Sequence, residues 1–109
     1  VEIQKYHHRS FTGMKESMEL YKPAFLADED DHNVVAVVKS LEALGQKPTF
    51  DCWDFGTDGA WTSVELNIPT IGYSPCEEKY AHTPEDRVSI ELMKKAAVGY
   101  GAISIAVAG

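Results

Sequence analysis

The sequence predicts an α/β fold in which helices flank a mostly parallel sheet. Two apolar runs, Thr49–Phe55 and Ile68–Tyr73, have the composition of strands, and turn residues follow each of them. About a dozen residues separate the two runs, which is the minimum for a parallel crossover, so we expect a right-handed βαβ unit. Helical periodicity at His32–Leu44 and again from Ile90 supplies the flanking helices.

The N-terminal quarter has weaker patterns. Val1–Tyr6 begins by alternating apolar and polar residues, which predicts a short strand. The chain from His7 to Phe25 is punctuated by Gly13 and Pro23 and shows no long amphipathic element, so we interpret it as a connector.

The first long helix is predicted at His32–Leu44. Asp30 or Asp31 is a suitable N-cap, and Gly45 stands where a helix commonly ends on a left-handed glycine. The β-branched run Val34–Val38 leaves a buried strand open as an alternative.

Turn chemistry divides the rest of the chain. Gly56–Gly59 is a turn, Ala60–Leu66 a short helix, and Ser74–Val88 a loop. Ser89 can cap the final helix from Ile90, whose end Gly99 and Gly101 leave open.

Charge and composition exclude several classes of partner. The 109 residues carry a formal net charge of −7, which argues against nucleic acid. The acidic run Asp28–Asp31 is interpreted as the solvated start of a helix, with a cation site as the alternative. The apolar stretch Ala96–Ile103 is too short for a membrane span, and no signal peptide is recognisable in Val1–Arg9. Cys52 and Cys76 form neither a disulfide framework nor a zinc-ligand pair, which favours a reducing cytoplasm.

His82 is the first candidate for chemistry. It follows the second predicted strand, with Glu77, Glu78, Glu85 and Asp86 nearby, and a carboxylate can orient an imidazole that binds a metal. From the residues alone, a lone histidine in a polar loop is more often a surface or hydrogen-bonding residue, and zinc needs about three or four ligands.

The second candidate is the turn that contains Thr57, Asp58 and Gly59. Backbone N–H groups of a glycine-rich turn can bind an anion or a carbonyl oxygen, and the Thr57 hydroxyl adds a further polar group. The alternative is a tight turn in which Thr57 or Asp58 is simply the N-cap of the next helix. The adjacent His7 and His8 point to opposite faces of a strand, so we expect both at the surface.

The segment Trp53–Val88 resembles the C-terminal end of the zinc-dependent acetylornithine deacetylase / succinyl-diaminopimelate desuccinylase / glutamate carboxypeptidase superfamily of metallopeptidases. Its motifs are Trp-Asp-Phe-Gly-Thr-Asp-Gly-Ala, Ile-Pro-Thr-Ile-Gly-Tyr-Ser-Pro and Ala-His-Thr-Pro-Glu-Asp-Arg-Val. The resemblance implies that His82 coordinates one of two zinc ions and that Thr57, Asp58 and Gly59 face the substrate. Some members carry an arginine after this turn to hold a carboxylate, and Ala60-Trp61 stand there, which counts against a dicarboxylic substrate.

The same resemblance covers nearly the whole chain. Within the superfamily, the chain resembles the subgroup of hydrolases linked to selenium metabolism. It implies that residues 1–25 are the end of a lid domain with its connector, and that residues 26–109 are the C-terminal segment of a zinc-peptidase-like catalytic domain. The implied enzyme hydrolyses an amide bond of an N-acyl amino acid or small peptide by zinc-assisted attack of water. The pair Glu77-Glu78 follows the second predicted strand, which is the wrong place for the general base of these enzymes. The general base and the other metal ligands would therefore precede Val1, and we expect this segment to be inactive alone.

Two other functions remain open from the sequence. One is a stand-alone, non-catalytic α/β module for binding or oligomerisation, and the other is a small metal-binding protein that uses His82 with Glu78 and Asp86. A segment of a larger domain exposes apolar surface, so we also expect self-association, as a homo-oligomer.

Overall fold

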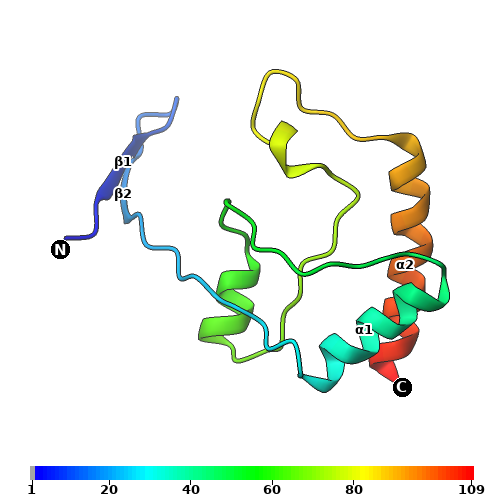
Figure 1. Cartoon of the computed structure of the whole chain (residues 1–109). Coiled ribbons are helices and arrows are strands. Elements are labelled where there is room, and N and C mark those ends of the chain that lie inside the picture. The colour runs from blue at the N-terminus through cyan, green and yellow to red at the C-terminus, as the bar shows by residue number, and fades with distance from the viewer. Residues whose placement is uncertain (1) are drawn as a thin grey trace.

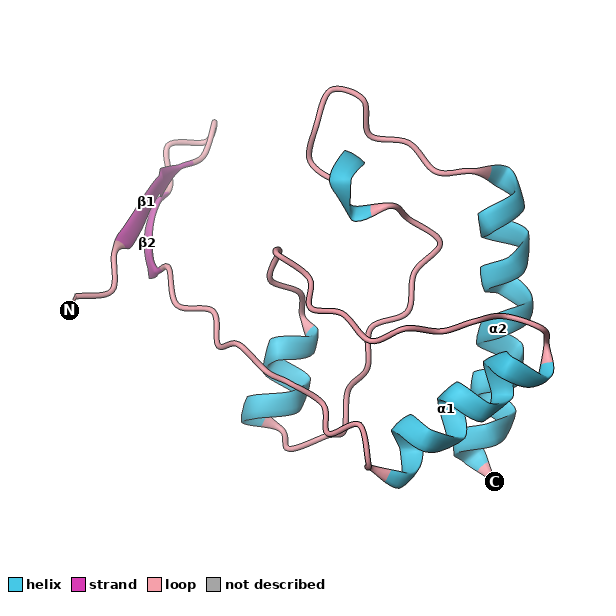
Figure 2. Cartoon of the chain, viewed as in Figure 1, coloured by secondary structure: helices cyan, strands magenta, loops and turns pink. Residues whose placement is uncertain are grey.

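The computed structural model describes residues 2–109, and its two α-helices cross at one side of the molecule while the N-terminal hairpin lies apart at the other side (Figure 1). In chain order the elements are β1 (Lys5–Arg9), β2 (Lys15–Glu19), α1 (His32–Ala43), η1 (Trp61–Glu65), η2 (Glu78–Tyr80) and α2 (Ile90–Ala108). Long irregular segments connect them, as the pink trace of Figure 2 shows. The radius of gyration is 17.5 Å, against about 13 Å for a compact domain of this length.

The predicted mostly parallel sheet is wrong. The described residues form one sheet, the antiparallel pair β1–β2, and Thr49–Phe55 and Ile68–Tyr73 are both irregular. The two segments meet through a side chain, because the indole of Trp53 lies against the backbone at Gly72, where an added Cβ would come 2.5 Å from Cη2. A strand-like composition shows only that the residues suit a pleated, half-buried surface. Here the two segments meet without the backbone hydrogen bonds that would make them strands.

The N-terminal hairpin extends beyond the predicted strand. Tyr6 pairs with Met18 and His7 with Ser17, so the second strand lies in the segment interpreted as a connector. Gly13, in the turn, adopts φ +88° and donates its N–H to the Ser10 carbonyl at 2.9 Å. Both strands are exposed along their whole length, as expected for His7 and His8.

The predicted helix at His32–Leu44 is confirmed as α1, and the strand alternative at Val34–Val38 is excluded. Asp31 is the N-cap, with Oδ1 accepting the Asn33 N–H at 2.8 Å. Val34, Val37 and Leu41, spaced at one helical face, are buried.

α2 confirms the helix predicted after Ser89, and it runs through both glycines. It packs against α1, and its buried residues are Ala96 and Gly99, the latter covered by the Tyr73 side chain. The short helix predicted at Ala60–Leu66 is found as the π-helix η1, in which the Leu66 N–H reaches the Trp61 carbonyl at 3.1 Å. In residues 2–109, no helix is long and apolar enough to cross a membrane.

Candidate functional site

Two loops that are distant in the sequence meet at His82. The imidazole lies against Phe55, with ring centroids 4.6 Å apart and an edge-on angle of 63°. Phe55 immediately precedes the Gly56–Gly59 turn, so the two sequence-derived candidates occupy adjacent loops. The sequence did not single out Phe55; an aromatic residue directly before a glycine turn was the available signal.

A hydrogen bond joins the same two loops a few residues away. The backbone N–H of Asp54 donates to Oε1 of Glu78 at 2.7 Å, across 24 residues of sequence. Glu78 opens η2, which leads into the His82 loop. The Glu78 carboxylate therefore fixes where that loop begins relative to Phe55. Because one of its oxygens already accepts this hydrogen bond, the carboxylate is not available to His82 alone.

The His82 backbone is in an unusual conformation. Its φ is +60°, in the left-handed region that non-glycine residues rarely occupy. The loop around it is closed by the Thr83 hydroxyl, which donates to the Tyr80 carbonyl at 2.8 Å, and by the Arg87 guanidinium, 4.0 Å from the Tyr80 ring centroid. Such backbone strain is concentrated at sites where a side chain must be presented in one direction, and His82 is exposed.

The Thr57–Gly59 turn starts a helix. The Thr57 hydroxyl accepts the Gly59 N–H at 3.2 Å, and the Thr57 carbonyl accepts the Ala60 N–H at 3.1 Å. Thr57 is thus the cap of the helical turn that leads into η1, and Asp58 stays exposed. A cap and a substrate-facing wall are compatible roles for one turn.

Glycine is required at position 59 because neighbouring atoms leave no room for a side chain, and not because of its backbone torsion angles. A Cβ there would come 2.9 Å from the Phe25 ring and 3.0 Å from both Thr57 Oγ1 and Thr70 Cγ2. Next to it, the hydroxyls of Thr62 and Thr70 are bonded at 2.8 Å. The turn is therefore a closely packed element rather than a loose loop.

The described residues do not assemble a zinc site by themselves. Across residues 2–109, no group of three or more His, Cys, Asp or Glu side chains is placed to hold a metal ion. Glu78 and Asp86 therefore do not complete a site with His82, and one imidazole does not fit zinc, which needs three or four ligands.

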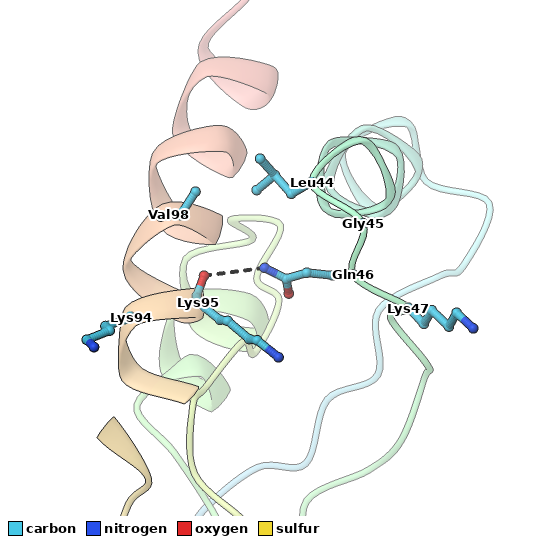
Figure 3. Close-up of a pocket in the computed structure, with 7 residues that line it drawn as sticks. All are labelled: Leu44, Gly45, Gln46, Lys47, Lys94, Lys95 and Val98. Carbon is cyan, nitrogen blue, oxygen red and sulfur yellow. Dashed lines mark hydrogen bonds between the residues drawn. The ribbon is translucent and has the colours of Figure 1, made fainter. Parts of the chain in front are cut away.

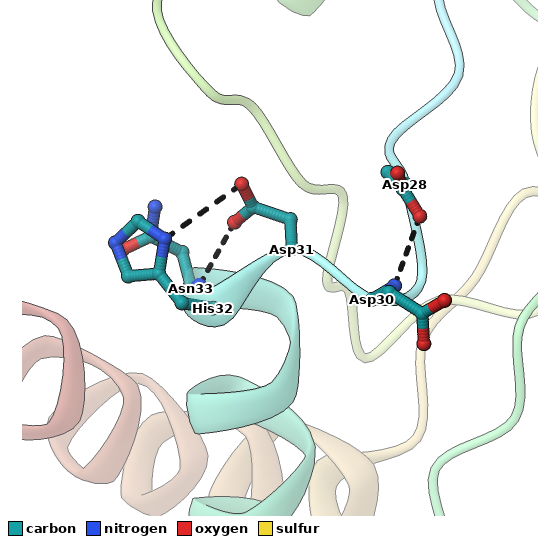
Figure 4. A network of polar contacts seen from close by, with 5 residues as sticks. All are labelled: Asp28, Asp30, Asp31, His32 and Asn33. Atoms are coloured by element: carbon teal, nitrogen blue, oxygen red, sulfur yellow. Dashed lines mark hydrogen bonds and ion pairs between the residues drawn. The ribbon is translucent and has the colours of Figure 1, made fainter.

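The acidic run Asp28–Asp31 has a structural role. Figure 4 shows the Asp31 carboxylate at the start of α1 in contact with the backbone N–H of Asn33 and with the His32 ring, whose Nδ1 is 3.9 Å away. Asp30 donates its N–H to Oδ1 of Asp28 at 3.0 Å. The hydrogen bond from the Asn33 N–H lowers the pKa of Asp31.

A cavity of about 540 Å³ lies between the end of α1 and α2, away from the sequence-derived candidates. Gln46 crosses it and donates to the Lys95 carbonyl at 3.3 Å (Figure 3). Lys47 and Lys94 also line it, but Figure 3 shows their side chains directed to opposite sides, and Lys94 pairs with Glu91 at 2.9 Å. Lys47 and Lys94 therefore do not converge on one ligand.

Comparison with known proteins places the chain beside relatives without an assigned activity. It is similar to uncharacterized protein YgeY of Escherichia coli (strain K12), with 33% identity over 106 residues that cover 96% of this chain and 26% of the relative. The same protein of Escherichia coli O157:H7 matches to the same extent. The chain thus spans about a quarter of the length of the curated relatives it matches. No protein-family model and no solved structure matches it.

Proposed function

We propose that this chain is the C-terminal segment of a larger co-catalytic zinc metallohydrolase that cleaves an amide bond of an N-acyl amino acid or small peptide. In this proposal His82 is a metal ligand, and Thr57, Asp58 and Gly59 form one wall of the substrate pocket. Residues 1–25 end a lid domain, and residues 26–109 belong to the catalytic domain. The segment alone is inactive, and its compartment is the cytoplasm.

The contact between His82 and Phe55 is the observation that carries the proposal. It brings the imidazole to the start of the Gly56–Gly59 turn, so a ligand held by His82 would lie beside that turn. His82 is exposed, so ligands from another part of the polypeptide can reach it.

The incomplete donor set also agrees with a segment of a longer enzyme. Because no three potential ligands come together in residues 2–109, a zinc ion bound by His82 would need its remaining ligands from elsewhere in the complete protein. The curated relatives are about four times longer than the matched segment and have room for them. Ala60 and Trp61 follow the turn where an arginine would bind a second carboxylate, so the proposed substrate carries one carboxylate or none there.

The test is a metal and activity measurement on the complete polypeptide that carries this segment. His82→Ala is expected to lower bound zinc, measured by atomic absorption, from two ions to one and to remove most amidase turnover. His8→Ala is the matched control, because His8 is an exposed histidine on β1. Unchanged zinc content and turnover in His82→Ala would exclude the ligand role.

A second measurement separates the proposal from a small metal-binding protein. Calorimetric titration of the 109-residue chain with zinc is expected to show only weak binding, since one imidazole cannot supply a complete site. Tight binding that His82→Ala abolishes would favour the metal-binding protein instead.

A further inference from the structure

Residues 21–25 lie along the glycine turn and η1, the helix that follows it (Figure 1). The Tyr21 ring meets the Trp61 ring edge to face, with ring centroids 6.4 Å apart. The Phe25 ring lies over Gly59, since its Cζ would be 2.9 Å from an added Cβ there. Aromatic contacts therefore hold both ends of this short segment, and the residues between them have a defined position beside the turn.

Lys22 lies between these two contacts, and its side chain crosses Gly56. An added Cβ at Gly56 would come 3.4 Å from Cγ, 2.5 Å from Cδ and 3.2 Å from Cε of Lys22. Three successive methylene groups thus lie against the backbone of the turn. Lysine commonly packs its methylene groups on a surface and keeps its charge in water, and Lys22 is exposed. Because Nζ is bonded to Cε, the ammonium group also lies beside the turn.

The ammonium group of Lys22 has no ion-pair partner in residues 2–109, where the three ion pairs involve other side chains. Gly56 is not among the residues with positive φ, so its backbone conformation does not require glycine. What glycine provides at this position is room for the methylene groups of Lys22. The arrangement therefore presents a positive charge at the turn and leaves it available to an anion.

We propose that Lys22 is a specificity-determining residue whose ammonium group binds the free carboxylate of an N-acyl amino acid. This rests on the proposed function and deepens it, because it names the substrate group that lies at the wall formed by Thr57, Asp58 and Gly59. The carboxylate of such a substrate is attached to the carbon next to the amide nitrogen. One small molecule can therefore reach both Lys22 and the loop of His82, which meets the start of the same turn. A charge-assisted hydrogen bond of this kind is about twice as strong as a neutral one.

The test compares N-acetyl-L-methionine with its uncharged amide, N-acetyl-L-methioninamide, as substrates of the complete polypeptide that carries this segment. Lys22→Met keeps an unbranched apolar side chain and removes the charge. We expect it to raise KM for the acid about tenfold to a hundredfold, with kcat little changed, and to leave KM for the amide unchanged. Lys47→Met is the matched control, because Lys47 is an exposed lysine beyond the end of α1 and should affect neither substrate.

Gly56→Ala is an independent variant, because its methyl group should displace the Lys22 side chain from the turn. It should raise KM for the acid as Lys22→Met does, and the double variant should show no further loss, since both changes remove one interaction. An unchanged KM for the acid in Lys22→Met, or an equal rise for acid and amide, would overturn the inference.

Calorimetry on the zinc-free complete protein makes the same comparison without turnover. The acid should bind the original protein more tightly than the amide does, and Lys22→Met should abolish that difference. Equal binding of acid and amide to the original protein would also overturn the inference. Because this measurement needs neither zinc nor hydrolysis, failure of Lys22 to bind a carboxylate is distinguishable from failure of His82 to bind zinc.

Discussion

The hydroxyl of Tyr100 on α2 donates a 2.6 Å hydrogen bond to the carbonyl of Tyr73, and the two rings meet edge to face at 5.2 Å. The Tyr73 hydroxyl in turn donates to Oε1 of Gln46 at 2.8 Å, just beyond α1. Tyr73 therefore ties an irregular segment to both helices. Because the loop of His82 follows that segment, the same contacts position the candidate site.

Gly99→Ala should disturb this arrangement, because its Cβ would collide with the Tyr73 side chain, with Cζ at 2.9 Å. Alanine gains about 1 kcal/mol of helix propensity over glycine, and overpacking costs about 1–3 kcal/mol. Gly101→Ala has the same propensity gain without a neighbour, so it serves as the control. We expect urea unfolding to show Gly99→Ala less stable than Gly101→Ala by roughly 1–3 kcal/mol. Equal stabilities would mean that Tyr73 does not pack on Gly99.

The end of α1 offers a second prediction. Gly45 has φ +74°, its N–H donates to the Glu42 carbonyl at 2.8 Å, and the Gln46 N–H donates to the Leu41 carbonyl at 3.1 Å. These two bonds are a Schellman motif, which needs a left-handed residue after the C-cap. Gly45→Ala should destabilise the chain by about 1 kcal/mol, and Gly45→Asn should cost less because asparagine tolerates this conformation. Chemical denaturation that ranks alanine equal to glycine would contradict the motif.

The sequence predicted the two α-helices because their signals are local. Asp31, Gly45 and Ser89 act within a few residues of the helix ends that they define, and the periodic apolar face of α1 needs no distant partner to be recognised. The hairpin was missed in part, because the exposed strands β1 and β2 have no buried face to give alternation.

The sheet could not be predicted in the same way. Whether Thr49–Phe55 becomes a strand depends on a neighbouring backbone, and in this structure the Trp53 ring meets Gly72 instead. The candidate site was accessible only in outline. His82 and the Gly56–Gly59 turn were chosen by residue type and resemblance, whereas Phe55 and the Asp54–Glu78 hydrogen bond emerge only when two distant loops are brought together.

A third prediction concerns pH and the cap of α1. Hydrogen bonding from the Asn33 N–H holds the pKa of Asp31 below its ordinary value of 3.8. The folded state therefore binds the proton less readily than the unfolded state, so the cap stabilises the chain above the unfolded pKa and this contribution disappears as the pH falls through the folded pKa.

Asp31→Ala should therefore lower the thermal midpoint at pH 7 and have a smaller effect near pH 2, as followed by circular dichroism. Asp30→Ala is the control, because Asp30 is the adjacent carboxylate and is not the N-cap. A loss of stability that is the same at both pH values would show that the charge of Asp31 plays no part.

The last prediction concerns the contact between Phe55 and His82, which can be measured without metal. An imidazole edge-on to a phenyl ring at 4.6 Å lies in the ring's magnetic field, so the His82 ring protons should have displaced NMR shifts. Phe55→Leu keeps an apolar side chain but removes the aromatic ring, and should return those shifts toward the values of an exposed histidine. Phe50→Leu, an exposed aromatic position in the same irregular segment, is the matched control. Glu78→Gln tests the second connection, because a neutral amide oxygen accepts the Asp54 N–H more weakly than the carboxylate and should loosen the loop. Shifts of His82 that do not respond to Phe55→Leu would show that the two loops do not meet in solution, and the pairing of His82 with the Gly56–Gly59 turn would fall with them.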